Sequence, residues 1–214
     1  MADRLAVAQQ ALLKAETQAG VRRRQVNPAA LSPQLLPVPQ EIAPLFQGGG
    51  LRRGSVVQVR GSASMLLAIA AAAGADADSW CAMIAMPDAG LIAAAESGLD
   101  LRRTVVVPKP GPDAPAVLGA LIDGFDVVVL GHCPALSEAD RRAATHRVRT
   151  RQVVLLTSMP WAQAHTVLQV TDRSWSGLGA GTGVLTGAQV TVAVTRHDAG
   201  QHVLRVPVSW AKAS

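Results

Sequence analysis

A short turn between a predicted strand and a predicted helix is where phosphate chemistry is first expected in this chain. Ser55–Val59 is an apolar run that predicts a buried strand, and Gly61 follows it as a tight turn. Ser62 or Ser64 is placed to cap a helix that continues to about Ala73. Backbone N–H groups at a helix start of this kind bind phosphate in nucleotide-binding P-loops. The turn is therefore the candidate nucleotide site.

The side chains that phosphoryl transfer needs are absent from this turn. With Gly61 as the first position, a P-loop has Gly, Lys and Ser or Thr at the sixth, seventh and eighth positions. This chain has Leu66, Leu67 and Ala68 there, so the phosphate-binding lysine and the Mg²⁺-binding hydroxyl are both missing. The site is predicted to be degenerate. Anion binding by the Ser62–Ser64 amides stays open beside simple helix capping.

Basic residues mark a second candidate surface, for partner or nucleic-acid contact. The densest run contains Arg141, Arg142, His146, Arg147, Arg149 and Arg151, and a weaker cluster contains Arg22, Arg23 and Arg24. In a helix, Arg142, His146 and Arg149 share one face. Three interpretations stay open for that face: simple solvation, contact with a phosphate backbone, and contact with an acidic protein.

Tryptophan is rare in this chain, and the late tryptophans are the third set of candidates. Trp161, Trp175 and Trp210 follow predicted strands or occupy late turns. Each either packs in the core or anchors an interface, because Trp and Arg often dominate binding energy at interfaces. Trp161 and Trp175 are kept as candidate contact residues.

Cysteine, histidine and charge content set wider bounds on function. Cys81 and Cys133 lie in or beside predicted buried strands, so we expect two reduced thiols rather than a disulfide. The five histidines have no metal-ligand spacing, so no metal site is expected. The formal charge of +5 suits nucleic acid or an acidic protein partner. Without a membrane-length apolar run or a signal-peptide pattern, a cytoplasmic location is expected.

Proline content divides the N-terminal part of the chain. Residues 1–26 predict an amphipathic helix for self-association or docking, with Leu5, Leu12, Leu13 and Ala15 on or beside its apolar face. Residues 27–47 contain five prolines and predict a linker without regular structure. The N-terminal helix is therefore expected to be tethered to a core that spans residues 48–214.

Strand and helix patterns alternate through most of that core. Short Val/Ile/Leu-rich runs separated by helical patterns predict an α/β fold with a mainly parallel sheet covered on both faces. Ser137 and Asp140 have the spacing of a capping box at the start of a helix that runs to about Arg149. After that helix the pattern becomes all strand, with turns predicted at Gly177–Gly183 and Asp198–Gly200. This part is predicted to extend the sheet in antiparallel fashion.

The order of these elements resembles the core ATPase domain of RecA. Residues 49–61 resemble its glycine turn and first strand, Asp126–Gly131 its Walker B strand, and Val184–Thr195 its late hairpin. The small size, the proline-rich linker and the Leu-Arg-Arg-Gly turn are most similar to the RecA-like ImuA group, in its short actinobacterial ImuA-prime form. SulA is a more distant relative. The resemblance implies a RecA-like core.

The departures from the RecA pattern bear on catalysis. Gly131 stands where the family has a metal-binding Asp, and Ala85–Pro87 occupies the region of the catalytic glutamate. Asp126 lies at the start of its strand, not at the end where Mg²⁺ would be held. Without the lysine, the metal ligand and the base, we expect a pseudo-ATPase that is not an enzyme and uses no cofactor. The two DNA-binding loops of RecA also look truncated here.

The resemblance supplies the expected pathway. ImuA-group proteins are accessories of SOS-induced mutagenic translesion synthesis and act with the Y-family-like protein ImuB and an error-prone C-family polymerase. The expected function is a non-catalytic adaptor in that complex, located at the nucleoid during DNA damage. Two alternatives stay open: a single-stranded DNA-binding RecA-like module, and a SulA-like inhibitor of cell division.

Overall fold

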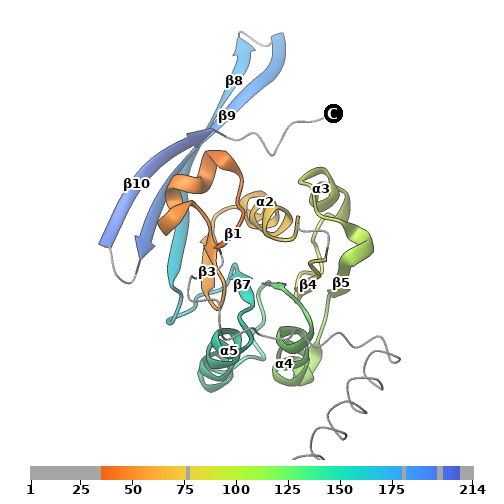
Figure 1. Cartoon of the computed structure of the whole chain (residues 1–214). Coiled ribbons are helices and arrows are strands. Elements are labelled where there is room, and N and C mark those ends of the chain that lie inside the picture. The colour runs from red at the N-terminus through yellow and green to blue at the C-terminus, as the bar shows by residue number, and fades with distance from the viewer. Residues whose placement is uncertain (1–34, 76–77, 180–181, 197–199, 208–214) are drawn as a thin grey trace, which may run out of the picture.

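The computed structural model describes residues 35–75, 78–179, 182–196 and 200–207 of the 214-residue chain. Its centre is an eight-stranded sheet in the order β10-β9-β8-β3-β7-β6-β4-β5 (Figure 1). The core strands are β3 (Val56–Arg60), β4 (Cys81–Ile84), β5 (Thr104–Val107), β6 (Val127–Leu130) and β7 (Val154–Thr157). All neighbouring pairs among these five strands are parallel, which confirms the predicted α/β fold with a mainly parallel sheet.

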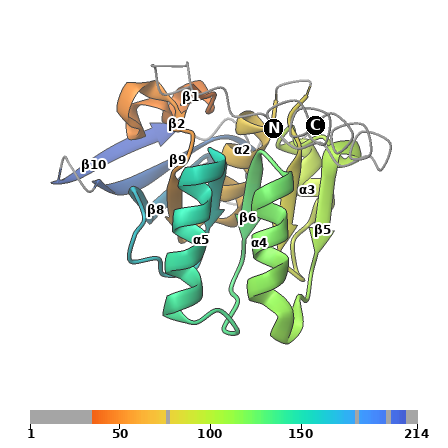
Figure 2. The ribbon, with the colours of Figure 1, turned by 60° about the horizontal axis from the view of Figure 1, so that its bottom comes forward.

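Helices cover the parallel strands on both faces (Figures 1 and 2). One face packs against α2 (Ala63–Ala73), and α3 (Leu91–Glu96) lies beside that helix. The other face packs against α4 (Ala114–Gly124) and α5 (Glu138–Arg151). Strands covered in this way bury both of their faces, which explains why β4, β6 and β7 read as continuous apolar runs.

Two helix starts follow the chemistry expected from the sequence. Ser62 caps α2, and its Oγ accepts a hydrogen bond from the Met65 N–H at 3.1 Å. The capping box of α5 is confirmed, because Ser137 Oγ accepts from the Asp140 N–H while the Asp140 carboxylate accepts from the Ser137 N–H. Short 3₁₀ turns, η3 (Leu101–Arg103) and η4 (Gly111–Asp113), lead into β5 and α4.

Residues 35–47 of the proline-rich segment pack in the core, so the boundary between linker and core that was predicted at residue 48 lies earlier in the chain. A short strand, β1 (Leu35–Leu36), pairs with β2 (Leu51–Arg52), and 3₁₀ helices η1 (Gln40–Leu45) and η2 (Gln47–Gly49) lie between them. The apolar side chains of this segment are buried in the main cluster: Leu36, Ile42, Leu45 and Phe46. Proline is compatible with extended backbone and with the first turn of a helix, so Pro37, Pro39 and Pro44 did not prevent this packing. The predicted helix over residues 1–26 lies outside the described residues.

The last three strands form the predicted antiparallel extension. β8 (Thr166–Gly179) pairs in parallel with β3, while β9 (Thr182–Arg196) and β10 (Gly200–Pro207) continue the sheet in antiparallel fashion. The turn predicted over Gly177–Gly183 is wrong in its extent, since β8 continues to Gly179 and β9 resumes at Thr182. Glycines in a hairpin ladder are tolerated where cross-strand hydrogen bonds continue. None of the helices in the described part of the chain has the length and apolar character needed to cross a bilayer.

Candidate functional site

The predicted nucleotide site lies where β3 ends and α2 begins, at the carboxyl edge of the parallel strands. Gly61 has a φ of +80° there, and a β-carbon on it would stand 2.8 Å from the Val170 carbonyl oxygen. The Ser62 hydroxyl is already used as the helix cap, and it also lies 3.1 Å from Ser64 Oγ and accepts from Arg173 Nη2 at 3.1 Å. The capping interpretation of Ser62 is therefore confirmed.

The positions that would carry the phosphate-binding lysine and hydroxyl are part of the core. Leu66, Leu67 and Ala68 are 1 %, 5 % and 1 % exposed. They belong to a helix with eight buried residues, and Leu66 and Leu67 pack in the main apolar cluster. A lysine at Leu67 would have to place its ammonium in apolar surroundings, at a free-energy cost of about 3 kcal/mol or more. These positions act in packing, not in phosphate binding.

Backbone and side-chain atoms fill the position at Gly131 where the RecA pattern would place a metal-binding aspartate. A β-carbon on Gly131 would overlap the Ala85 carbonyl oxygen and lie 2.6 Å from Met86 Cγ. Ala85 has a φ of +56°, a left-handed conformation that alanine rarely adopts. The Gly131 N–H donates to the Ile84 carbonyl oxygen, which holds the two segments together, and the Ala85 N–H donates to the Val107 carbonyl oxygen of β5. An aspartate therefore does not fit where the Walker B carboxylate would stand.

Asp126 has a structural role at the opposite, amino edge of the sheet. Its Oδ2 accepts a hydrogen bond from the Trp80 N–H at 3.0 Å, and its Oδ1 lies 3.5 Å from Arg53 Nη1. The Arg53 side chain is only 9 % exposed. A buried guanidinium needs a carboxylate partner of this kind, so Asp126 is fixed in an ion pair far from the candidate nucleotide site.

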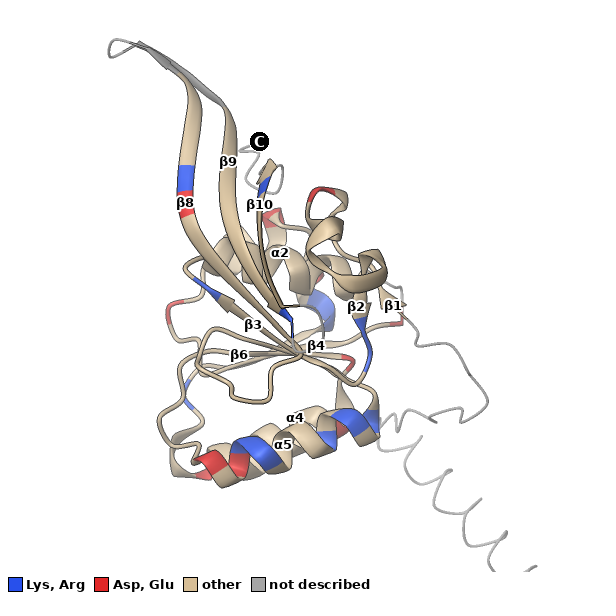
Figure 3. Cartoon of the chain, turned by 90° about the vertical axis from the view of Figure 1, so that its left-hand side faces the viewer, with Lys and Arg blue, Asp and Glu red and all other residues tan. Residues whose placement is uncertain are grey.

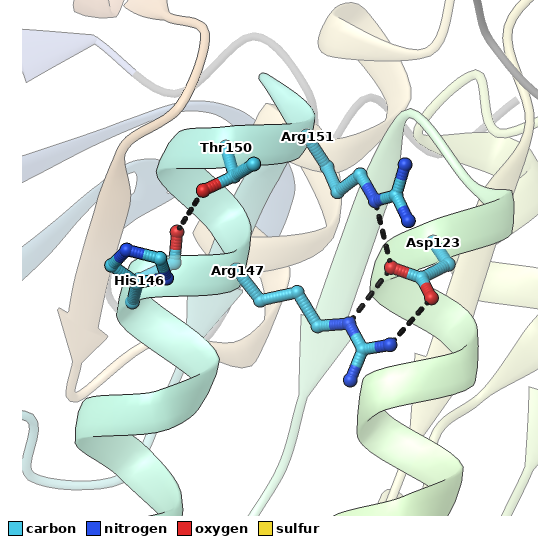
Figure 4. Close-up of polar contacts among 5 residues, drawn as sticks. All are labelled: Asp123, His146, Arg147, Thr150 and Arg151. Carbon is cyan, nitrogen blue, oxygen red and sulfur yellow. Dashed lines mark hydrogen bonds and ion pairs between the residues drawn. The ribbon is translucent and has the colours of Figure 1, made fainter.

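The basic run lies on α5, and acidic side chains neutralise much of its charge (Figure 4). Arg147 forms a two-pronged ion pair with Asp123 on α4, with distances of 2.8 and 2.6 Å, and Arg151 Nε donates to the same carboxylate at 3.0 Å. The hydrogen bond from Arg147 is the main cause that lowers the pKa of Asp123, with help from Arg151. In return, the pKa of Arg147 is raised. Arg147 therefore pairs with α4, although its side chain stays 49 % exposed, and its role as a partner contact stays a prediction.

Arg142, His146 and Arg149 on α5 are exposed, whereas Arg141 is partly buried. Arg142 pairs with Glu138 one turn earlier, and this hydrogen bond lowers the pKa of Glu138. His146 and Arg149 are also exposed, so the predicted face of Arg142, His146 and Arg149 does exist on the surface. One of its two arginines is engaged by an acid on the same helix, which weakens the face as a phosphate-binding surface.

The two candidate tryptophans have opposite environments. Trp161 is 3 % exposed, packs in the cluster under α4 and α5, and donates from Nε1 to Thr145 Oγ1 at 2.9 Å. Its prediction as a contact residue is wrong, because its ring fills the core and its N–H has a partner there. Trp175 is 51 % exposed on β8, as an interface anchor would be. Sequence reasoning missed its neighbour Arg173, although alternation along a strand places both side chains on one face.

Other predicted residues carry less information. The candidates Arg22, Arg23, Arg24, Leu5, Leu12, Leu13 and Ala15 lie outside the described residues. Cys81 and Cys133 are free and buried, and burial raises the pKa of the Cys81 thiol to about 12, so it stays protonated and unreactive. Within the described ranges, His, Cys, Asp and Glu form no group of three or more that could hold a metal ion.

Comparison with known proteins gives two matches. The sequence model of the MT3502 N-terminal domain family matches residues 44–163, which include the candidate nucleotide site and α5 but end before β8. Uncharacterized protein Rv3395c of Mycobacterium tuberculosis (strain ATCC 25618 / H37Rv) is 36 % identical over 159 residues, which are 73 % of this chain and 70 % of that protein. The ribbon formed by β8 and β9 therefore lies beyond the residues that the family model describes.

Proposed function

This chain belongs to the MT3502 N-terminal domain family, and from that premise we propose that it is a non-catalytic, RecA-like adaptor of a mutagenic translesion DNA synthesis complex. Its partners would be an ImuB-type Y-family-like protein and, directly or through that protein, an error-prone C-family polymerase. The resemblance to the ImuA group supplies this pathway. The sheet of parallel strands with an antiparallel extension supports the RecA-like part of the proposal.

The closed carboxyl edge is the observation that carries the adaptor proposal. The overlap that a side chain on Gly131 would make with Ala85, and the buried leucines of α2, remove room for a metal ligand and for a phosphate-binding lysine. Phosphoryl transfer depends on these groups for charge stabilisation. A scaffold of this kind that lacks these catalytic groups still has a rigid sheet with covering helices, and their exposed surfaces can contact other proteins.

Exposed aliphatic side chains at the β5 end of the sheet offer one such surface. Leu91 and Ile92 of α3 are 41 % and 77 % exposed, and Leu101 and Val105 lie nearby in the chain on η3 and β5 with 41 % and 37 %. When a partner covers these aliphatic groups, the complex is stabilised by about 25 cal/mol for each Å² of apolar surface removed from water. We propose that the ImuB-type partner docks at this end of the sheet, and that residues 1–26 add a second docking or self-association element.

A capture experiment tests the proposal. The full chain is immobilised and purified ImuB-type partner is passed over it, with Mg-ATP and single-stranded DNA each added or withheld. Capture that is equal in all four conditions, and that falls in Ile92→Asp, is the expected result. Val203→Asp is the matched control, since Val203 is a similarly exposed aliphatic residue on β10 at the opposite edge of the sheet. Capture only with Mg-ATP, or no capture at all, would overturn the proposal.

A further inference from the structure

Strands β8 and β9 extend well past the rest of the sheet. β3 has five residues and its last pair with β8 joins Arg60 to Gln169, whereas β8 and β9 have fourteen and fifteen residues. β10 also stops early, with its last pair joining Pro207 to Gln189. Within the described residues, β8 and β9 beyond that point pair with each other alone. They form a two-stranded ribbon that projects from the body (Figure 3).

The ribbon is polar and has few charged residues. Residues 173–189 contain one arginine, many Gly, Ser and Thr residues, and no Asp or Glu. Residues Thr171 to Gly177 are all exposed. Asp172 stands at the base of the ribbon and points to the opposite face from Arg173. The face that carries Arg173 therefore presents a cation, and the sequence from 173 to 189 adds no carboxylate to it, so this face suits a phosphate group.

One face of the ribbon carries an exposed indole beside a guanidinium. Arg173 and Trp175 are two residues apart on β8, so their side chains share a face. Arg173 Nη2 donates to Ser62 Oγ at 3.1 Å, which shows that this face is turned toward the start of α2. Trp175 is opposite Ala188 and remains 51 % exposed. We call this surface the Arg173–Trp175 face.

We propose that the Arg173–Trp175 face binds single-stranded nucleic acid, with one unpaired base stacked on Trp175 and a neighbouring phosphate on Arg173. Stacking on an aromatic ring combined with basic contacts to the backbone is how proteins bind single strands without sequence preference. A protein partner fits this face less well. Protein interfaces bury a core of several apolar groups, and Trp175 is the one large apolar side chain among the exposed residues 171–177. This inference goes beyond the adaptor role and does not depend on it.

The test uses the purified full chain and a fluorescently labelled oligothymidine, with affinity measured by anisotropy between about 50 and 200 mM salt. Trp175→Ala is expected to weaken binding about tenfold, whereas Trp175→Phe keeps a stacking ring and most of the affinity. Arg173→Gln is expected to lower the slope of log affinity against log salt by about one unit. Arg149→Gln on α5 is the matched control and is expected to leave the affinity and the slope unchanged.

Several outcomes would overturn the inference. They are absence of binding by the parent protein, equal affinity of the Trp175→Ala variant, tighter binding of a duplex of the same length, or loss of binding in Arg149→Gln but not in Arg173→Gln. Circular dichroism of each variant shows whether the fold is intact, and the paired Phe variant separates loss of stacking from loss of structure. The anisotropy experiment contains no partner protein, so a negative result in it does not bear on the adaptor proposal. A negative capture experiment likewise does not bear on binding of single-stranded nucleic acid.

Discussion

The α5 surface and the β8–β9 ribbon both carry arginine, but their surroundings differ. On α5, Arg147 and Arg151 share Asp123, and Arg142 pairs with Glu138. On the ribbon, Arg173 donates to a hydroxyl, and the neighbouring Asp172 points to the opposite face of β8. The tryptophans follow the same division, with Trp161 buried beneath α5 and Trp175 exposed on the ribbon.

The difference shows that arginine density in a sequence does not by itself locate a binding surface. Three of the α5 arginines join helices or helix turns, and two carboxylates offset part of their positive charge. On the ribbon, Arg173 shares its face with an exposed aromatic ring, while the adjacent Asp172 points to the other face, so this face offers a partner both a cation and an apolar ring.

The largest effect expected from this comparison is on stability, and it separates the two tryptophans. Trp161→Ala should lower the free energy of unfolding by about 3–5 kcal/mol, because it leaves a cavity in the core and removes the partner of Thr145. Trp175→Ala should change it by less than about 0.5 kcal/mol, because the indole is exposed. Urea unfolding followed by circular dichroism measures both. Equal losses of unfolding free energy in the two variants would contradict the difference in environment between Trp161 and Trp175.

A smaller effect is expected from the ion-pair network on α5. The two arginines lower the pKa of Asp123, so the folded state stabilises its charged form. That contribution is present above the unfolded pKa of about 4 and is lost as the pH falls through the lower folded pKa. Asp123→Asn should therefore cost about 0.5–1 kcal/mol at pH 7, after allowance for solvent screening, and nothing once the pH is below both pKa values.

Thermal or urea unfolding of this variant across the acid range measures the effect, with Asp88→Asn as an exposed control. A cost that persists unchanged at the lowest pH would show that Asp123 acts through packing and not through its charge. In that case Asp123 would not be offsetting the charge of the α5 arginines, and the contrast drawn between α5 and the ribbon would be wrong.

Much of the fold could be predicted from the sequence because its signals are local. Val-, Leu- and Ile-rich runs set the buried strands, and Ser137 with Asp140 sets the start of α5. The N-terminal segment could not be predicted, since proline excludes regular ladders but not burial, and Ile42 and Leu45 pack through contacts distant in sequence. The length of β8 was missed because its glycine content favours a turn.

The candidate site was predictable in part. The absence of a lysine at Leu67 and of an aspartate at Gly131 can be read directly from the sequence. The closure around Gly131 cannot, because it depends on Ala85, which follows β4 and has a left-handed backbone conformation. The burial of Arg53 and Trp161 depends on partners such as Asp126 and Thr145, which no local pattern identifies.

We propose that the carboxyl edge of the parallel strands does not bind nucleotide. Titration calorimetry of the full chain with Mg-ATP, together with thermal unfolding in its presence, measures this property. We expect no saturable heat up to about 1 mM nucleotide and no rise in Tm beyond that given by an equal concentration of salt. Saturable binding that is weakened by Ser62→Ala would contradict it and would show that the closed edge still holds a phosphate.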